Sequence, residues 1–450
     1  MKPSTVVFAA LIAFFPYLVL AQSSLLQSGP MAGYSSMQEV GLWVQTTGTA
    51  EVSIRYWPKG SPHKVYTTNT ICTDSQHAFT AHLVADSLQP GQTYLYRLYI
   101  NKELVERPYE LSFQSQPIWK WRTDAPDFSF ALGSCMYINE PAYDRPGKPY
   151  GRGYDIFNSI LDRDPDFMLW LGDNVYLREA DWNSRSGILG RYTHDRATAE
   201  LQPLLGSVHH FAIWDDHDYG PNNSDRSFWN KDITAEAFRL FWRNPNYGLS
   251  GEEDVTGTFL WHDVQFFLMD DRWFRAPNAL KDDAKPLLGS AQLQWLKDAL
   301  LFSDASFKII AIGSQVLSTE AEGENYMVYP EEREELISFI QKHNIPGVLF
   351  LSGDRHFTEL SVHTGGGYPL YDLTVSPLTS GVHPPDGESN VLRVPETLVT
   401  EQNFAVANVT GAKENRKLTL SVFDDKGKVL WEKSIYQNAL KQGGMQEDSD

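Results

Sequence analysis

The stretch FAIWDDHDYGPNNSD, residues 211–225, places three carboxylates and an imidazole directly after four apolar residues. The run from Phe211 to Trp214 predicts a short buried strand. The residues that follow it without a spacer are Asp215, Asp216, His217 and Asp218. Crowded like charges raise the free energy unless a positive charge lies among them. A solvated acidic turn, which Asp, Gly, Pro and Asn favour, is the alternative, and the rest of the chain decides between the two.

The same arrangement recurs at other apolar runs between residues 128 and 356. FSFAL precedes GSC, FMLWL precedes GDNVY, FFLMD precedes DR, KIIAI precedes GSQ, and VLFLS precedes GDRH. Amphipathic segments alternate with these runs, among them YDIFNSILDR, TAEAFRLFWRN, SAQLQWLKDALL and EEREELISFIQKH. The alternation predicts an α/β sheet that is covered on both faces. Ligand sites in such sheets lie at the carboxyl ends of the strands, so we expect the polar residues to meet there.

The chain is long enough for two domains. Short alternating runs from about Gln38 to Phe113 predict an all-β sandwich, which we bound at residues 30–116. The segment DSLQPGQTYLYRLYI, residues 86–100, resembles a stretch of fibronectin type III-like domains, which implies a fibronectin III or immunoglobulin-like fold. Residues 117–127 are the expected linker, 128–436 the larger domain, with a closing hairpin, and 437–450 an acidic tail.

The chain of 450 residues carries 38 basic and 57 acidic residues, a formal net charge of −19. This charge disfavours nucleic-acid partners, and a phosphate substrate would need a local positive site such as a bound metal. Residues 1–21, with Lys2, a long apolar stretch and cleavage after Ala21, match a secretory signal peptide. We therefore expect a secreted or periplasmic protein with no stable membrane insertion after cleavage. A membrane anchor is the alternative.

The predicted strand ends gather side chains with metal-ligand chemistry. They are Cys135, Asp173, Tyr176, Asp215, Asp216, His217, Asp354 and His356. Several buried carboxylates cannot all stay ionised without cations among them, so this set indicates a metal site. Thiolate with phenolate favours a trivalent iron-type ion, whereas an all-oxygen shell favours calcium, magnesium or manganese.

Four motifs carry a resemblance to a known family: GSC at 133–135, GDNVY at 172–176, WDDHD at 214–218 and SGDRH at 352–356. They resemble the motifs of PhoD-like alkaline phosphatases and phosphodiesterases, a branch of the calcineurin-like metallophosphoesterases. The resemblance covers roughly residues 128–436. It implies a two-layered β-sandwich flanked by helices, and a hydrolase for small-molecule phosphate esters. It also implies a binuclear or trinuclear site, Fe³⁺ plus Ca²⁺ with Mn²⁺, Zn²⁺ or Mg²⁺ as alternatives, and an attacking hydroxide that bridges the metals.

The resemblance also implies a role for each residue. Asp173 would bridge the two metals. The iron would be bound by Cys135, Tyr176 and His356, and the second metal by Asp216 and Asp354, with Asp215, Asn222 and Asn223 as possible extra ligands. His217 would face the substrate. Arg355 and Arg178 could hold phosphoryl oxygens, because a guanidinium fits phosphate, or could form salt bridges to nearby carboxylates.

Several alternatives stay open. A phosphodiesterase or phospholipase D-like enzyme would use the same site, with pocket walls made by long loops such as 137–153 and 177–195. A non-catalytic secreted binding protein is the alternative from another class. The two cysteines, Cys72 and Cys135, could form a disulfide in an oxidising compartment. We instead expect Cys135 to bind metal, which leaves Cys72 as a lone buried thiol, and we expect His209 and His210 to be structural.

Overall fold

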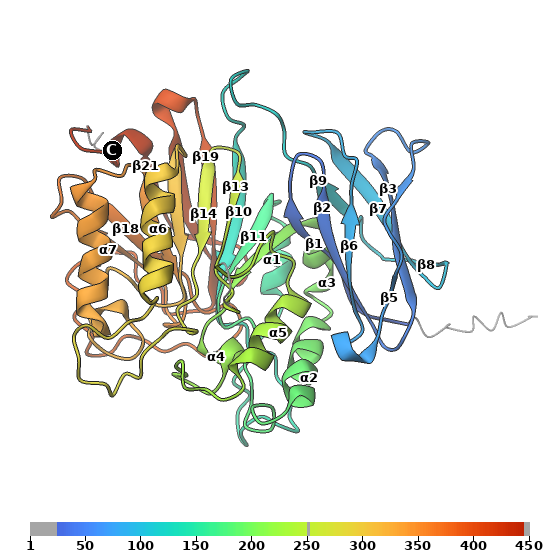
Figure 1. Ribbon diagram of the computed structural model, residues 1–450, viewed down its shortest axis with the longest axis horizontal. Helices are drawn as coiled ribbons and strands as arrows, with labels where there is room; N and C mark the ends of the chain where they lie inside the picture. The colour runs from blue at the N-terminus through green and yellow to red at the C-terminus, as the bar shows by residue number, and fades with distance from the viewer. Residues whose placement is uncertain (1–24, 250–252, 445–450) are drawn as a thin grey trace, which may run out of the picture.

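The computed structural model describes residues 25–249 and 253–444, and the predicted signal peptide and residues 445–450 of the predicted tail lie outside this range. Among the described residues, no helix combines the length and the apolar character needed to cross a membrane. The described segments form three sheets, with helices packed on two of them (Figure 1). The helices are α1 (Ile156–Leu161), α2 (Arg185–Arg196), α3 (Gln202–Ser207), α4 (Asp216–Tyr219), α5 (Lys231–Phe241), α6 (Ser290–Phe302) and α7 (Pro330–Lys342). Short 3₁₀ turns are η1 (Ser75–His77), η2 (Tyr326–Val328), η3 (Lys413–Asn415) and η4 (Gln437–Ala439).

The first sheet combines strands from both sides of the linker. Its strands are β1 (Leu26–Ser35), β2 (Val40–Thr46), β6 (Thr80–Ala85), β10 (Phe128–Gly133), β11 (Phe167–Leu171), β12 (His209–Ile213), β19 (Asn403–Thr410), β20 (Lys417–Asp424) and β21 (Val429–Tyr436), in the order β21-β20-β19-β10-β11-β12-β1-β2-β6. In its middle, β10, β11 and β12 pair in parallel, and every residue of β11 and β12 is buried. Burial on both faces explains why these strands appear in the sequence as continuous apolar runs.

The second sheet packs face to face on the first. Its strands are β13 (Gly257–Trp261), β14 (Val264–Leu268), β15 (Phe307–Ala311), β16 (Val348–Ser352), β17 (Glu359–His363) and β18 (Leu370–Thr374), in the order β13-β14-β15-β16-β18-β17. One apolar core fills the space between the sheets, and within it the ring centroids of Phe211 and Phe259 lie 3.7 Å apart. Separate cores join α6 and α7 to the second sheet and α1, α2, α3 and α5 to the first (Figure 1). The predicted mixed α/β fold, with sheets stacked between helices, is therefore confirmed.

The N-terminal segment is built from β strands, as predicted. A third sheet contains β3 (Glu51–Pro58), β4 (Tyr66–Thr67), β5 (Ile71–Cys72), β7 (Thr93–Ile100), β8 (Glu103–Val105) and β9 (Ser112–Gln114). It packs on β1, β2 and β6 around a core of its own. Strand β1 was not predicted, because its sequence LQSGPMAGYS is rich in residues that favour turns. The fibronectin III or immunoglobulin-like identity of this segment and the domain bounds remain predictions.

Strand β1 continues the first sheet from the larger domain into the N-terminal segment. It pairs in parallel with β12, with Ala32 opposite His209. The buried imidazole of His209 joins β12 to β1 and β9, because its Nδ1 lies 2.7 Å from the Gly33 carbonyl oxygen and its Nε2 accepts the Gln114 N–H at 3.0 Å. His210 bonds similarly to Trp170 and to the Leu204 carbonyl. The structural role predicted for both histidines is confirmed.

Helix α2 corrects the prediction that residues 177–195 form a long loop. Ser184 caps the helix by accepting the Gly187 N–H at 3.1 Å. The helix has no continuous apolar stripe, because several of its inward positions carry charged side chains, among them Arg191 and Asp195, which are buried in ion pairs. A search for apolar periodicity therefore does not find this helix.

We expect His209 to make stability depend on pH. Burial lowers the pKa of His209 to about 4, whereas an imidazole in the unfolded chain has a pKa of about 6.5. The unfolded chain therefore binds the proton more readily, so the stability contribution is complete above pH ~6.5 and is lost as the pH falls toward ~4. Between pH ~7.5 and ~5.5, the free energy of unfolding measured with urea should fall by about 1 kcal/mol more in the wild type than in His209→Phe, which cannot titrate. Equal pH dependence of the two proteins would contradict this prediction.

Candidate metal centre

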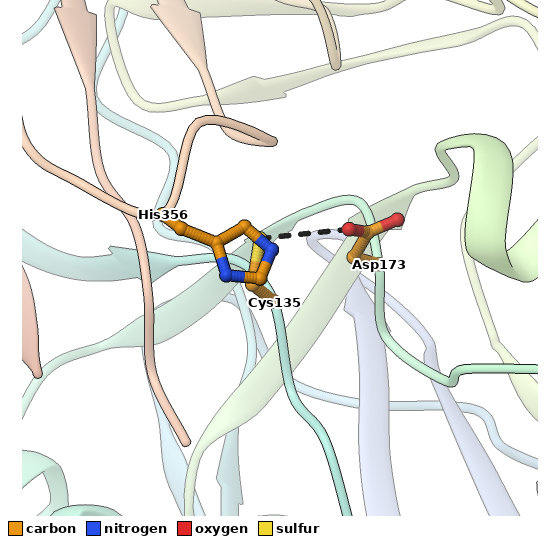
Figure 2. Close-up of side chains that lie close together, drawn as sticks. All are labelled: Cys135, Asp173 and His356. Atoms are coloured by element: carbon orange, nitrogen blue, oxygen red, sulfur yellow. Dashed lines mark hydrogen bonds between the residues drawn. The ribbon is translucent and has the colours of Figure 1, made fainter. Parts of the chain in front are cut away.

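The carboxyl ends of four strands bring the predicted ligands together. Cys135 follows β10, Asp173 follows β11, Asp216 begins α4 just after β12, and Asp354 and His356 follow β16. Figure 2 shows Cys135 and His356 side by side, with the Asp173 carboxylate facing them. Cys135 Sγ lies 3.5 Å from Asp173 Oδ2. The convergence expected from the sequence is therefore present.

Glycines let the strand ends approach one another closely. A Cβ atom on Gly172 would lie 2.6 Å from the Cβ of Asp215, and one on Gly353 would lie 2.4 Å from the Leu171 carbonyl oxygen. Any side chain at either position would push the strand ends apart. The glycine in each Gly-Asp pair is therefore required for close packing, in addition to forming a turn.

Several of the predicted ligands have left-handed backbone conformations, which L-residues rarely adopt. The φ angle is 60° at Cys135, 51° at Asp173, 64° at Asp354 and 59° at His356. Each such conformation costs of order 1–3 kcal/mol and persists only where the surrounding structure enforces it. Conformations of this kind cluster at functional sites, and here they coincide with the strand ends that carry the ligands.

The first ligand cluster combines sulfur, nitrogen and oxygen. One ligand atom each of Cys135, Asp173 and His356 lies within 4.8 Å of the others. The buried Tyr176 hydroxyl lies 3.1 Å from His356 Nε2. His356 Nδ1 lies 2.5 Å from the Gly381 carbonyl oxygen, so Nδ1 carries the ring proton and donates it to this carbonyl. Nε2 is then unprotonated, and its lone pair faces the cluster. Such an orientation suits a metal-binding imidazole.

The second cluster shares a carboxylate with the first. It consists of Asp173, Asp216 and His217, again with ligand atoms within 4.8 Å of one another. Asp216 Oδ2 accepts the backbone N–H of Asn223 at 2.5 Å, while Asp216 Oδ1 is buried without a hydrogen-bond partner in the described part of the chain. Only backbone contact to the exposed Asn223 is seen, so its ligand role stays a prediction, as does that of the exposed Asn222. The His217 ring packs on Tyr176, with centroids 4.2 Å apart.

Asp215 lies in a third acidic cluster that contains a cation of the chain itself. Asp215, Glu324 and Asp354 bring carboxylate oxygens within 4.8 Å of one another. The fully buried Arg272 donates from Nε to Asp215 Oδ1 at 2.6 Å and also pairs with Glu324. Asp215 additionally caps α4. Sequence reasoning missed the roles of Arg272 and Glu324, because their pairing links segments far apart in the chain.

The two predicted phosphate-binding arginines differ in position. Arg178 is buried, pairs with Asp144 at 2.9 Å and donates to the Ile138 carbonyl, so the salt-bridge alternative describes it. Arg355 is more exposed, pairs with Glu388 and lies 3.9 Å from Asp354 Oδ2. Of the two, only Arg355 stays a plausible substrate contact.

Two residues that the sequence did not single out lie beside His356. The Tyr150 hydroxyl lies 3.1 Å from His356 Nδ1 and 2.8 Å from His383 Nε2. Both come from loops, one between β10 and α1 and the other after β18. Neither has a strand-end signal in the sequence, so only the tertiary structure could reveal them.

The electrostatics of the site fit bound cations. Burial raises the pKa of Asp173 well above its usual value, and the neighbouring Cys135 and Asp216 raise it further. Burial also raises the pKa of Asp354 to about 6 and that of the Cys135 thiol to about 11. A cation among these groups would reverse these shifts and favour the deprotonated ligands. Together with the unpaired Asp216 Oδ1, this donor set fits a metal centre.

The cysteines do not form a disulfide. Both are free thiols; Cys135 is buried in the cluster, whereas Cys72 is exposed. The expectation that Cys72 is buried is therefore wrong, because it lies at the end of the short strand β5, whose one partner strand in the described part of the chain is β3. Cys135 remains available as a ligand.

Comparisons with known proteins agree with this geometry. A family model described as PhoD-like phosphatase matches residues 130–433, and a model described as a domain of unknown function (DUF7800) matches residues 23–118. Alkaline phosphatase D of Bacillus subtilis (strain 168) is 24% identical over 334 residues, 62% of this chain and 53% of that protein. The chain thus spans about half the length of this curated relative.

Solved structures share the fold. A structure of PhoD is 18% identical with a TM-score of 0.74, covering 93% of this chain and 95% of that chain. A purple acid phosphatase from yellow lupin (Lupinus luteus) seeds is 13% identical with a TM-score of 0.68, covering 92% of this chain and 75% of that chain. Since the matching family model spans more than half of the chain, including every predicted ligand, this chain belongs to the PhoD-like phosphatase family.

Proposed function

We propose that this protein is a secreted, metal-dependent phosphate-ester hydrolase of the alkaline phosphatase type. The observation that carries the proposal is the position of Asp173, which belongs to two adjacent ligand clusters of different chemistry. One carboxylate between two clusters suits a binuclear centre of the kind that clamps a phosphoryl group. The description of the matching family as phosphatases and the name of the curated relative support the same reaction. Secretion rests on the predicted signal peptide.

The ligands fall into two sets that suit different metals, and the second set takes Asp216 from the second cluster and Asp354 from the third. We assign Fe³⁺ to the cluster with Cys135, Tyr176 and His356, because thiolate and phenolate favour a trivalent iron-type ion. We assign Ca²⁺, with Mn²⁺, Zn²⁺ or Mg²⁺ as alternatives, to Asp216 and Asp354, with Asp215 and Asn223 as further oxygen ligands. An additional ion at Asp215 and Glu324, as in a trinuclear centre, would compete with the guanidinium of Arg272.

Different residues of the chain then have different roles in hydrolysis. When bound, the metals polarise the phosphoryl group and make hydroxide available from water. Asp173 belongs to both clusters and so fixes their positions relative to each other. His217, packed on Tyr176, donates a hydrogen bond to the phosphoryl or leaving oxygen. Arg355 gives up its ion pair with Glu388 and binds a phosphoryl oxygen of the substrate instead.

The direct test compares an aryl phosphomonoester with the matching diester in metal-replete protein at mildly alkaline pH. We expect faster turnover of the monoester, and Asp173→Asn should reduce both rates to near background, because both metals share this ligand. Asn tolerates the left-handed backbone at this position, so the fold should persist. Asp164→Asn is the matched control, because Asp164 has a similar φ of 50° but is exposed and outside the site.

Each other outcome has a distinct meaning. Full activity of Asp173→Asn would disprove the shared-ligand centre. A faster diester would favour the phosphodiesterase or phospholipase D-like alternative. No turnover of either substrate, with both metals present by elemental analysis, would favour the non-catalytic binding protein.

His217 should matter for catalysis more than for metal retention. His217→Ala should lower kcat by ~10²–10⁴-fold, the usual contribution of a positioned proton donor. Elemental analysis of the purified variant should show unchanged metal content. Loss of a metal would identify His217 as a ligand, since it lies within the second cluster. His343→Ala, which changes an exposed histidine after α7, is the control.

Tyr176 should give the protein a visible colour when iron is bound. Burial raises the pKa of the free phenol well above its usual value, so only a strong cation would make it a phenolate. Iron-loaded protein should therefore show a charge-transfer band in the visible spectrum, and Tyr176→Phe should lack it. A colourless and fully active wild type would rule out iron as the first metal.

A further inference from the structure

A cavity lies at the opposite end of the strands from the metal centre. It has a volume of about 770 Å³ and is lined by the linker, the end of β1 and the turn between β13 and β14. Asp263 and Ser306, which precede β14 and β15, also line it. The metal ligands follow their strands, whereas these residues precede theirs. In Figure 1 the linker rises at the top, between β9 and β10, and α4, which carries Asp216, lies at the bottom.

The walls of the cavity are aromatic. Trp119 and Trp121 come from the linker, Tyr34 from β1, and the stacked pair Phe211 and Phe259 from the two facing sheets. Trp121 is 90% exposed, an unusual position for the largest apolar side chain. Cavities of this size with aromatic walls and a few polar groups are typical of small-molecule sites.

Two buried polar atoms on the lining residues have no partner within the described part of the chain. Gln116 is only 7% exposed, and its backbone is fully engaged, with N–H donated to Ser36 and C=O accepting from Gly91. Its side-chain Oε1 accepts no hydrogen bond. His262 Nδ1 is also buried and unpaired. Because an unpaired buried acceptor is costly, a shift of these side chains toward the cavity would let them pair with a ligand that brings hydrogen-bond donors.

The charges around the cavity disfavour an anionic ligand such as phosphate. Its lining carboxylates are Glu39, Asp124, Asp263 and Asp304, against the two lysines Lys120 and Lys413. Lys120 already pairs with Asp304 at 2.7 Å and lies 5.5 Å above the Trp121 ring. The position that a cation would take over this aromatic ring is thus occupied by the chain itself. A neutral ligand with several donors fits the remaining surface.

We propose that this cavity binds a sugar unit of an uncharged glycan. A sugar ring presents C–H faces that pack on aromatic rings and hydroxyl groups that donate to acceptors such as Gln116 Oε1. Burial lowers the pKa of His262 to about 4, so its imidazole is neutral and can accept or donate a hydrogen bond to a hydroxyl. Since the cavity lies away from the metal centre, bound glycan would tether the enzyme without blocking it.

The test titrates the intact chain with three uncharged hexasaccharides while tryptophan fluorescence is recorded. They consist of β-1,4-linked glucose, α-1,4-linked glucose and β-1,4-linked N-acetylglucosamine. We expect at least one to bind with a Kd of about 1 mM or tighter. Trp121→Ala and Gln116→Leu should each weaken binding by ~10-fold or more, because one loses the stacking surface and the other the acceptor. Hydrolysis of the aryl phosphomonoester should be unchanged in both variants.

Trp229→Ala is the matched control, because Trp229 is 67% exposed and does not line the cavity. It should keep the wild-type Kd. Trp121→Ala removes an exposed side chain and is expected to fold even if Gln116→Leu does not. No binding of any hexasaccharide up to about 10 mM would overturn the proposal, as would binding that neither variant weakens. Fluorescence changes with spermidine but with none of the sugars would identify a cation site and also overturn it. Because hydrolysis is measured separately, failure of the phosphatase proposal would be seen independently.

Discussion

The site depends on one constraint, the electrostatic repulsion among the carboxylates of Asp173, Asp216 and Asp354. These groups lie close together, beside the Cys135 thiol. Asp173, Asp216 and Cys135 are almost fully buried and Asp354 is largely so, and burial raises the pKa of Asp173, Asp354 and Cys135. Arg272 compensates for part of the negative charge, at Asp215 and Glu324. It also lowers the pKa of Asp216, but in the described part of the chain it forms no ion pair with Asp173, where bound metals would supply the positive charge.

The scaffold holds this unfavourable cluster together through the large apolar core. The ligands belong to strands in both sheets, so separating the sheets would separate the ligands. Phe130 and Phe167 of the first sheet stack at 5.0 Å, and both meet Phe266 of the second sheet edge-on. Left-handed backbone conformations and close packing at glycines then set the directions of the ligand side chains. The favourable free energy of burying apolar side chains in the core thus offsets the backbone strain and the charge repulsion at the carboxyl ends of the strands.

The two ends of the strands in the continuous first sheet carry different groups of residues. Because β1 pairs with β12, the N-terminal segment is joined to the strand that leads into Asp215 and Asp216. The carboxyl ends of the parallel strands form the metal centre. Their amino ends, together with the linker, form the aromatic cavity. In our two proposals, the carboxyl ends of the strands would bind an anionic phosphate with metals, and the amino ends would bind a neutral ligand.

Much of this protein could be predicted from the sequence, because the signals are local. An apolar run followed by Gly-Asp or Asp-Asp-His indicates a buried strand and the polar group at its end, as at Asp173 and His217. Resemblance in four motifs then indicated the family and its ligands. Strand β1 and helix α2 were missed because turn-forming residues and buried charges hide their periodicity. Arg272, Glu324, Tyr150 and His383 acquire their roles only through contacts between segments distant in the chain, and so do Gln116 and Trp121 at the cavity. The sequence by itself determined which groups end the strands, since that is a property of neighbouring residues. Only the tertiary structure decided which distant side chains meet them, since the packing of the two sheets sets those distances.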